Sequence, residues 1–355
     1  MTKITSKVYI NVGRFGVSMA PFLFIALVIL RLFLSTLHNS KTKKMAHPAD
    51  VQLLNKALSG IGVDEKSLIS ILTKTHHEHK RFIRKGCSQF FIEDERQFER
   101  WDDSAIKNLK VEFKRFKDAV MLSLMHPWER DARLLKKALK KGPQLYGVIV
   151  EIACTRSSDE LLGARKAYHS LFERSIEEDL ATHVKGTERK LLVALVSAYR
   201  YEGPKVKEDT AKSEAKELLQ AINNRDKRKP IEDEEVIRIL TTRSKPHLRE
   251  VYQQYKKISG KTITEGLEAE ILLKETIECL CTPHTYFTKV FETALREDAN
   301  EDDKKALTRL VSTQEAGNLK GISDKFAHKI EERVKGAYKD VLLGVLAKGQ
   351  MSGQA

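Results

Sequence analysis

The feature of this sequence that most constrains its fold is an internal repeat with helical periodicity. In four segments, an apolar helical stretch is followed by a short polar turn and a second amphipathic stretch. Aligning Ile71, Ile152, Ile239 and Leu310 gives spacings of 81, 87 and 71 residues between the segments. Repeats of this kind are supersecondary units that stack and bury one another's apolar faces. The sequence therefore predicts an array of four related helical units.

The apolar residues within the repeats follow the period of an α-helix. Leu191, Leu192, Leu195 and Val196 share one helical face, and no sustained alternation of apolar and polar residues is present. This periodicity predicts an all-α fold. Residues 201–216, a charged stretch that contains Gly203 and Pro204, are predicted to be a linker between the two halves of the array.

Composition limits the partners. The net charge is +14, but residues 1–44 carry seven basic and no acidic residues, which leaves +7 on the rest. No compact block of Lys and Arg interleaved with aromatics is present, so nucleic acid is not expected as a partner. The four cysteines are too few and too irregularly spaced for a secreted disulfide framework, which favours a cytosolic protein with reduced thiols.

Residues 1–44 have a different composition from the rest of the chain. Met19 to Leu30 is an unbroken apolar run, and only by including Pro21 and Arg31 does the stretch reach the length of a spanning helix. Met45 begins "MAHPAD", which looks like the start of a soluble domain. Two interpretations stay open: residues 1–44 are a membrane anchor, or they are not part of the working protein.

Several phrases resemble annexins, and plant annexins in particular. They are "HPWERDARLL", "VEIACTRSSDELLGARKAYHSLFE", "RKLLVALVSAYRYEG" and "VIRILTTRSK". The resemblance covers about residues 46–349 and implies four annexin repeats of about five short helices each, forming a curved disc. The repeats are expected at residues 45–126, 127–201, 214–288 and 289–349, after the extension at 1–44.

The resemblance also implies a function. An annexin is expected to be non-enzymatic and cytoplasmic, and to bind anionic phospholipid membranes peripherally through calcium, with a link to stress and calcium signalling. Self-association on membranes and actin binding are further expectations. The residues at Ile237–Ile239 match a motif suggested for actin binding, although their apolar pattern also suits core packing.

The stretch "LSGIGV" is the best calcium candidate. Calcium takes six to eight oxygens, often backbone carbonyls with one carboxylate, and glycine tolerates the backbone bends that this requires. By resemblance to the family's loop, the carbonyls of Leu58, Gly60 and Gly62 are expected to face the ion. Val63 stands where the family pattern has Thr. A plain turn is the alternative interpretation.

A carboxylate from a second segment should complete the site. Counting back from the helix "AVMLSLMHP" places the family's position at Val111, so Glu112 is expected to reach the ion after a one-residue shift at a helix start. Asp102 and Asp103 are closer to the family's spacing but lie in an apparent insertion.

The other repeats have poorer loops. The second has one glycine and Pro143, and the third has no G-x-G. The fourth is acidic, with Asp298, Glu301, Asp302 and Asp303, but it lacks glycine. Its carboxylate position aligns with Arg333, which should repel a cation. The four acids either attract calcium loosely or form a solvated loop.

Other chemistry has weaker support. The cluster "THHEHK" at 75–80 lacks the H-E-x-x-H spacing of a zinc site, and Lys74 occupies the position of a histidine proposed for peroxidase activity in plant relatives. Cys154 and Cys279 match two neighbouring cysteines of plant annexins, which suggests a redox pair or small core residues. Two rival functions remain: membrane binding mainly by basic charge, and a haem peroxidase.

Overall fold

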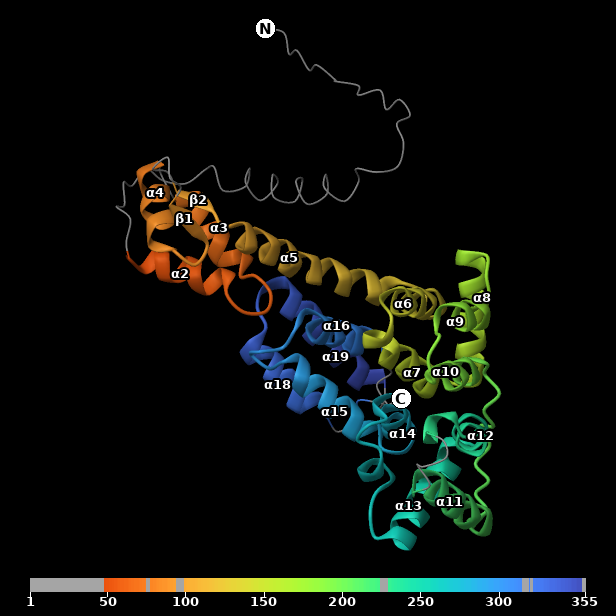
Figure 1. The fold of residues 1–355 in the computed structure, drawn as a ribbon. Coiled ribbons are helices and arrows are strands. Elements are labelled where there is room, and N and C mark those ends of the chain that lie inside the picture. Colours follow the sequence, from red (N-terminus) through yellow and green to blue (C-terminus); the bar gives the residue numbers. More distant parts are fainter. Residues whose placement is uncertain are drawn as a thin grey trace. The chain divides into compact units, whose positions relative to one another are not determined.

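The described part of the chain consists almost entirely of helices (Figure 1). The computed structural model describes residues 48–352 except 75–76, 94–98, 224–228, 315–318 and 320–321. It divides into two compact units. The described residues of the first are 48–57 and those in 65–106, and the second holds 58–64 and the rest from Lys107 onward. The predicted all-α class is confirmed.

The first unit contains the opening helices of the first repeat and a small hairpin. Its elements are α2 (Pro48–Leu58), α3 (Glu65–Lys74), α4 (His77–Gly86), β1 (Phe91–Glu93) and β2 (Glu99–Trp101). The strands are antiparallel with Phe91 opposite Trp101, and these two rings lie 4.3 Å apart between centroids. The sequence pattern missed the hairpin because strands of three residues are too short to show alternation.

Helix α5 (Asp103–Leu124) passes from the first unit into the second without a break (Figure 1). In the second and fourth repeats the equivalent stretch is interrupted near Gly186 and Gly336, and Gly336 has φ +64°. Aligning "VKGTERK" and "VKGAYKD" with "EFKRFKD" puts Lys114 at the glycine position. Since lysine favours the helix interior and disfavours positive φ, the first repeat has one long helix where those repeats have two.

The second unit contains the other three repeats. The second repeat comprises α6 (Pro127–Lys141), η1 (Pro143–Leu145), α7 (Tyr146–Thr155), α8 (Ser158–Phe172), α9 (Ile176–His183) and α10 (Glu188–Val196). The third comprises α11 (Glu208–Asn223), η2 (Pro230–Glu232), α12 (Glu234–Thr242), α13 (Lys245–Ser259), η3 (Ile263–Gly266) and α14 (Ile271–Cys281). The described helices of the fourth are α15 (Pro283–Ala294), α16 (Glu301–Thr313), α18 (Ser323–Arg333) and α19 (Gly336–Ser352).

Two sequence boundaries shift. The linker predicted at 201–216 is shorter, because α11 already begins at Glu208, and the alanine, lysine and glutamate residues that follow are good helix formers. The expected boundary at 288/289 falls inside α15, so we place the start of the fourth repeat near Thr282, the residue before that helix.

Side-chain caps fix where several helices begin. Ser157, Ser175 and Asn300 each accept a hydrogen bond from the helix they precede, and in each case the acidic residue three positions later bonds back to the cap. These capping boxes satisfy amide groups that would otherwise lack partners.

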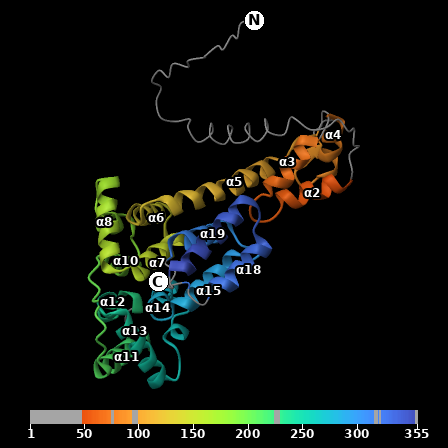
Figure 2. The same cartoon turned by 180° about the vertical axis from the view of Figure 1, so that it is seen from behind.

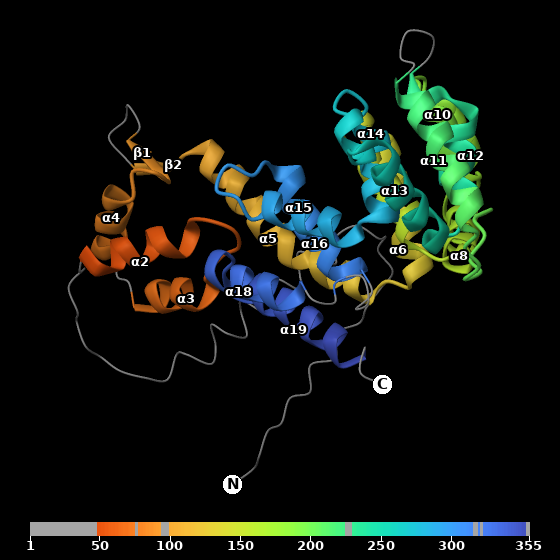
Figure 3. The ribbon, with the colours of Figure 1, turned by 90° about the horizontal axis from the view of Figure 1, so that it is seen from below.

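The predicted helical faces form the core of the second unit. Leu191, Leu192, Leu195 and Val196 are all buried. Helix α6 packs along α8, and α11 packs along α13 (Figures 2 and 3). In the fourth repeat the rings of Phe291 and Phe326 stack with centroids 3.9 Å apart.

Buried ion pairs join the first helix of a repeat to the end of its second helix. In the second repeat, Arg156 Nε donates to Asp131 Oδ2 at 2.6 Å. In the third, Glu214 on α11 accepts from Arg243 and lies 2.9 Å from the Nε2 atom of His247. A buried carboxylate needs such partners, because losing one leaves an uncompensated charge away from water.

Stability at acid pH should depend on Glu214. Burial acts to raise the pKa of Glu214, but hydrogen bonds from Arg243 and His247 outweigh it and hold that pKa below the ordinary value. This stabilisation is therefore present above the unfolded pKa of about 4.3 and is lost as pH falls through the lower folded pKa. We expect Glu214→Gln to lower the free energy of unfolding at pH 7 by about 3 kcal/mol. We also expect a shallower loss of stability than in the parent as pH falls below 5.

Urea unfolding at a series of pH values measures both effects. Glu217→Gln, on the same helix but with a side chain that is 41% exposed, is the matched control and should change the free energy by less than about 0.5 kcal/mol. A Glu214→Gln variant as stable as the parent at pH 7 would contradict this role.

Candidate metal site in the first repeat

The loop between α2 and α3 has two residues in the left-handed region. Gly60 has φ +87° and Gly62 has φ +83°. In the corresponding loop of the second repeat only Gly142 has a positive φ, and in that of the fourth no described residue does. A side chain in this region costs about 1–2 kcal/mol per residue, so the double glycine allows a backbone path that the fourth-repeat loop does not follow.

This loop docks on the segment that joins α18 to α19. Ile61 and Val334 form a parallel β-bridge, and Lys335 N donates to Ile61 O at 2.9 Å. The Nζ atom of Lys335 also donates to Ser59 O at 2.7 Å. A Cβ placed on Gly62 would lie only 2.4 Å from Lys335 O, whereas one on Gly60 would be 3.8 Å from Lys335 Nζ. Gly62 is therefore required by close backbone contact as well as by its φ angle.

Glu112 reaches the same loop from α5, as the sequence suggested. Its Oε2 atom accepts from Gly62 N at 2.7 Å and from Arg115 Nε at 2.9 Å. Arg115 is buried, and its Nη2 atom donates to Glu301 Oε1 at 2.6 Å. The alternative acid Asp102 instead accepts from Ala105 N at 2.9 Å at the start of α5. The structure thus brings Glu112 together with Gly62.

The side chains at this loop do not form a metal site by themselves. No group of three or more His, Cys, Asp or Glu side chains within the described residues could hold a metal ion. A cation at this loop would therefore depend on carbonyls and one carboxylate, which is a ligand set that calcium accepts. The ammonium group of Lys335 and the guanidinium of Arg115 lie beside it and would oppose a second positive charge.

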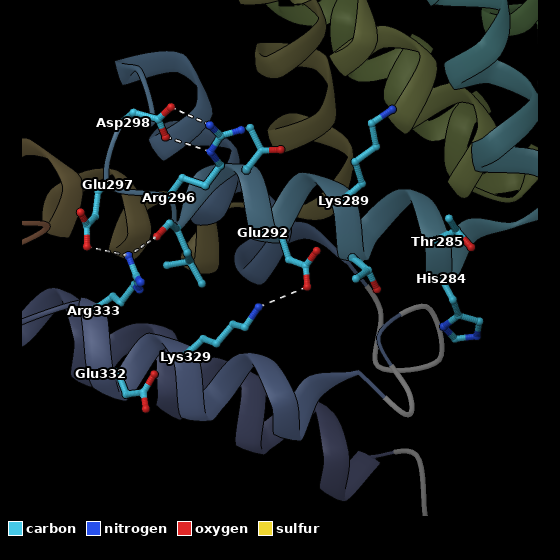
Figure 4. Close-up of a pocket in the computed structure, with 13 residues that line it drawn as sticks. His284, Thr285, Lys289, Glu292, Arg296, Glu297, Asp298, Lys329, Glu332 and Arg333 are labelled. Atoms are coloured by element: carbon cyan, nitrogen blue, oxygen red, sulfur yellow. Dashed lines mark hydrogen bonds and ion pairs between the residues drawn. The ribbon is translucent and has the colours of Figure 1, made fainter.

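The corresponding loop of the fourth repeat already contains a protein cation (Figure 4). Arg333 Nη1 donates to Leu295 O at 3.3 Å, and Arg333 lies 3.7 Å from Glu297. In the repeat alignment Leu295 matches Leu58. The guanidinium group therefore lies on a carbonyl equivalent to one expected to bind calcium in the first repeat.

The acids of the fourth repeat are engaged in internal contacts. Hydrogen bonds from Arg296 hold the pKa of Asp298 below its ordinary value. Glu301 pairs with Arg115, and Asp302 pairs with Lys305 at 2.9 Å. Asp303 belongs to the capping box of α16. These contacts favour a closed ion-pair network over a loose calcium site.

Two other candidates from the sequence are the histidine cluster at residues 75–80 and the apolar motif at Ile237–Ile239. His79 Nε2 lies 3.1 Å from Asp50 Oδ2, while Thr75 and His76 lie outside the described residues. Ile239 is fully buried in α12, which supports packing as its role.

The two cysteines of the suggested redox pair are free and buried. Burial raises the pKa of the Cys154 thiol to about 11, although Arg200 and Lys245 act to lower it. Burial likewise raises the pKa of Cys279. Protonated thiols are poor nucleophiles, so these values favour small core residues over a reactive pair.

The apolar run at residues 19–30 lies outside the described part of the chain. Within the described residues, no helix combines the length and the apolar character needed to cross a bilayer.

The sequence did not reveal the roles of Lys335 and Arg115. Lys335 belongs to "VKG", which also occurs at 184–186, but nothing in that phrase shows that its side chain reaches a loop some 270 residues earlier. Arg115 follows Glu112 at helical spacing, which indicated a pair but not its burial.

These features define a class: an all-α protein built of helical repeats, whose first repeat carries a double-glycine loop beside a carboxylate. Comparison with known proteins then identifies the family. The Annexin family model matches residues 130–195 and 214–271. The chain is 49% identical over 320 residues to Annexin D4 of Arabidopsis thaliana, covering 86% of this chain and 99% of that protein. It is 37% identical to the Annexin-like protein RJ4 of Fragaria ananassa, with 84% and 95% covered. The chain belongs to the annexin family.

Solved structures agree with this assignment. Annexin III is similar with a TM-score of 0.57 and 26% identity, covering 84% of this chain and 92% of that one. Chicken annexin V is similar with a TM-score of 0.56 and 26% identity, covering 88% and 98%. Family and fold support calcium and phospholipid binding as the general class of function.

The two loop glycines should differ in their tolerance of a side chain. Gly60→Ala adds only the strain of positive φ, about 1–2 kcal/mol. Gly62→Ala adds the same strain and a clash with the Lys335 carbonyl, so it should lower the free energy of unfolding by clearly more. Urea unfolding in calcium-free buffer measures the difference. Equal losses for the two variants would show that the loop does not dock on Lys335 as described.

Proposed function

We propose that this chain binds anionic phospholipid membranes peripherally in response to calcium, and that the loop at residues 58–62 is its principal calcium site. The contact between Gly62 and Glu112 is the observation that carries this proposal, because it joins a left-handed glycine loop to a carboxylate. The carbonyls of Leu58, Gly60 and Gly62, with the carboxylate of Glu112, would hold the ion.

The ligand count explains why a membrane would take part. Three carbonyls and one carboxylate supply at most five oxygens, whereas calcium takes six to eight. Water or a lipid phosphate would supply the rest, so calcium and anionic lipid should each strengthen the binding of the other. Recruitment of a cytoplasmic protein to membranes as calcium rises also fits a part in calcium or stress signalling.

Nearby protein cations should lower the affinity of this site for calcium. Lys335 Nζ already donates to Ser59 O, and Arg115 already binds the Glu112 Oε2 atom. Calcium must enter against the field of both groups, which raises the calcium concentration needed for binding. Lys335 thus acts as an internal competitor of calcium at the first-repeat loop.

Alternative functions have less support. Membrane attachment by charge alone would use the +7 balance of the chain after residue 44, but it leaves the double-glycine loop without a purpose. A haem peroxidase has less support because Lys74 stands at the position of the histidine proposed for this activity in plant relatives. Actin binding and self-association stay proposals based on family resemblance.

Sedimentation with phosphatidylserine liposomes in a calcium titration tests the site. Glu112→Gln should raise the half-saturating calcium concentration by about tenfold or more, equivalent to about 1.4 kcal/mol, because it removes the only carboxylate. Lys335→Gln should lower it severalfold, because it removes the competing charge.

Glu301→Gln is the matched control, since it removes the other carboxylate partner of Arg115 without touching the loop. It should titrate like the parent. If Glu112→Gln also titrates like the parent, the site is misassigned. If the parent binds fully in the presence of EGTA, charge-driven attachment is the better function.

A further inference from the structure

A second site of a different kind is indicated by a cavity of about 280 Å³ in the second unit. Residues of α5, α6, the η1–α7 segment and α16 line it. Its apolar lining residues are Met121, Leu122, Met125, Leu134, Ala138, Leu145 and Val148. None of them belongs to the loop at residues 58–62.

The polar part of the cavity wall is strongly basic. Six lining side chains are cationic and two are acidic: Lys114, Arg115, Arg133, Lys137, Lys305 and Arg309 against Asp118 and Asp302. Four of the cations are already paired with carboxylates: Arg115, Arg133, Lys305 and Arg309. No salt bridge joins Lys114 or Lys137 to a residue that the structure describes. Both lysines are exposed and make no salt bridge with the described residues, although the Asp118 carboxylate acts on Lys137 from nearby.

Lys137 lies among charges of both signs. Burial lowers the pKa of Lys137, and the nearby charges of Lys305 and Lys114 lower it further, although Asp118 and Asp302 act in the opposite direction. A bound anion between Lys114 and Lys137 would relieve this repulsion.

A buried donor in the same cavity wall also supports an anion as the ligand. The Arg115 side chain is only 3% exposed, and its Nη1 atom has no hydrogen-bond partner. Buried N–H groups are nearly always paired in folded proteins, so an unpaired one marks a place where an acceptor is missing.

We propose that this cavity binds a single-chain anionic lipid. The phosphate or carboxylate head group would lie between Lys114 and Lys137, and the first part of the acyl chain would lie on the apolar floor. A free phosphate could satisfy the lysines but not the apolar floor, where the burial of acyl-chain methylenes would add to the affinity. The cavity volume is just below the usual range of ligand pockets, about 300–1,000 Å³, so the cavity has room for only part of an acyl chain.

This site needs no calcium, so it stands apart from the proposed function. Isothermal titration in EGTA-containing buffer, with dodecanoyl lysophosphatidate below its micellar concentration, tests it on the full chain. We expect one molecule bound per chain. Inorganic phosphate and dodecanoyl lysophosphatidylcholine should each bind at least tenfold more weakly.

The charge test uses two matched pairs of substitutions. Lys114→Gln with Lys137→Gln should weaken lysophosphatidate binding at least tenfold. Lys117→Gln with Lys140→Gln removes the same charge from the same two helices, outside the cavity lining, and should leave the affinity within twofold. Leu145→Trp, which fills the apolar floor, should also reduce binding while the protein still melts cooperatively.

Three results would overturn the proposal. Inorganic phosphate binding as tightly as the lipid would show that the apolar floor takes no part. An equal loss in both charge pairs would show general attraction to a basic surface. Unchanged affinity in Leu145→Trp would place the acyl chain elsewhere. None of these results would affect the calcium-dependent liposome binding proposed for residues 58–62.

Discussion

The close approach of Gly62 to the carbonyl of Lys335 is the constraint on which the first-repeat loop depends. A Cβ at this position would lie 2.4 Å from Lys335 O. The preceding residues of the two segments, Ile61 and Val334, form a β-bridge that holds the segments together. The backbone is then held so that Gly62 N faces the carboxylate of Glu112. A loop held at two points loses little entropy when an ion binds, which favours preorganised binding.

The segment Arg333–Lys335 forms hydrogen bonds with two loops. Its backbone and the Lys335 side chain hold the loop of the first repeat, while the Arg333 side chain holds Leu295 O in the loop of the fourth. In both places a protein cation lies on a backbone carbonyl. The acids are paired in both loops: Glu112 pairs with Arg115 in the first, and the carboxylates of the fourth pair with Arg296, Arg333 and Lys305. The two loops differ in their backbone, because only the first has glycines at positive φ, and the calcium site is proposed there.

Local periodicity predicted much of this fold. The all-α class and the apolar face of α10 follow from spacing within short windows, and the four-repeat order follows from the internal repeat. Counting back from a helix that recurs in the repeats also singled out Glu112, because related repeats place corresponding residues in similar positions.

Features that depend on single substitutions or distant contacts could not be predicted. Replacing a junction glycine by Lys114 turns two expected helices into the single α5, and the sequence alone does not say that the helix stays intact. The hairpin at Phe91–Trp101 combines strand pairing with contacts of the Trp101 ring to Phe90 and Phe91. Lys335 contacts Ser59, which lies 276 residues earlier in the sequence, so no local pattern records the contact. The hairpin and the Lys335 contact depend on tertiary packing, which local sequence patterns do not record.

Calcium-bound crystals offer the most direct test of the calcium site. An anomalous difference map, measured at a wavelength where calcium scatters anomalously, would locate each bound ion without reference to function. We expect the strongest peak among the carbonyls of Leu58, Gly60 and Gly62, next to Glu112, and no peak in the loop from Leu295 to Asn300, where Arg333 lies. A peak in the fourth-repeat loop with none at the first would contradict the assignment of the calcium site.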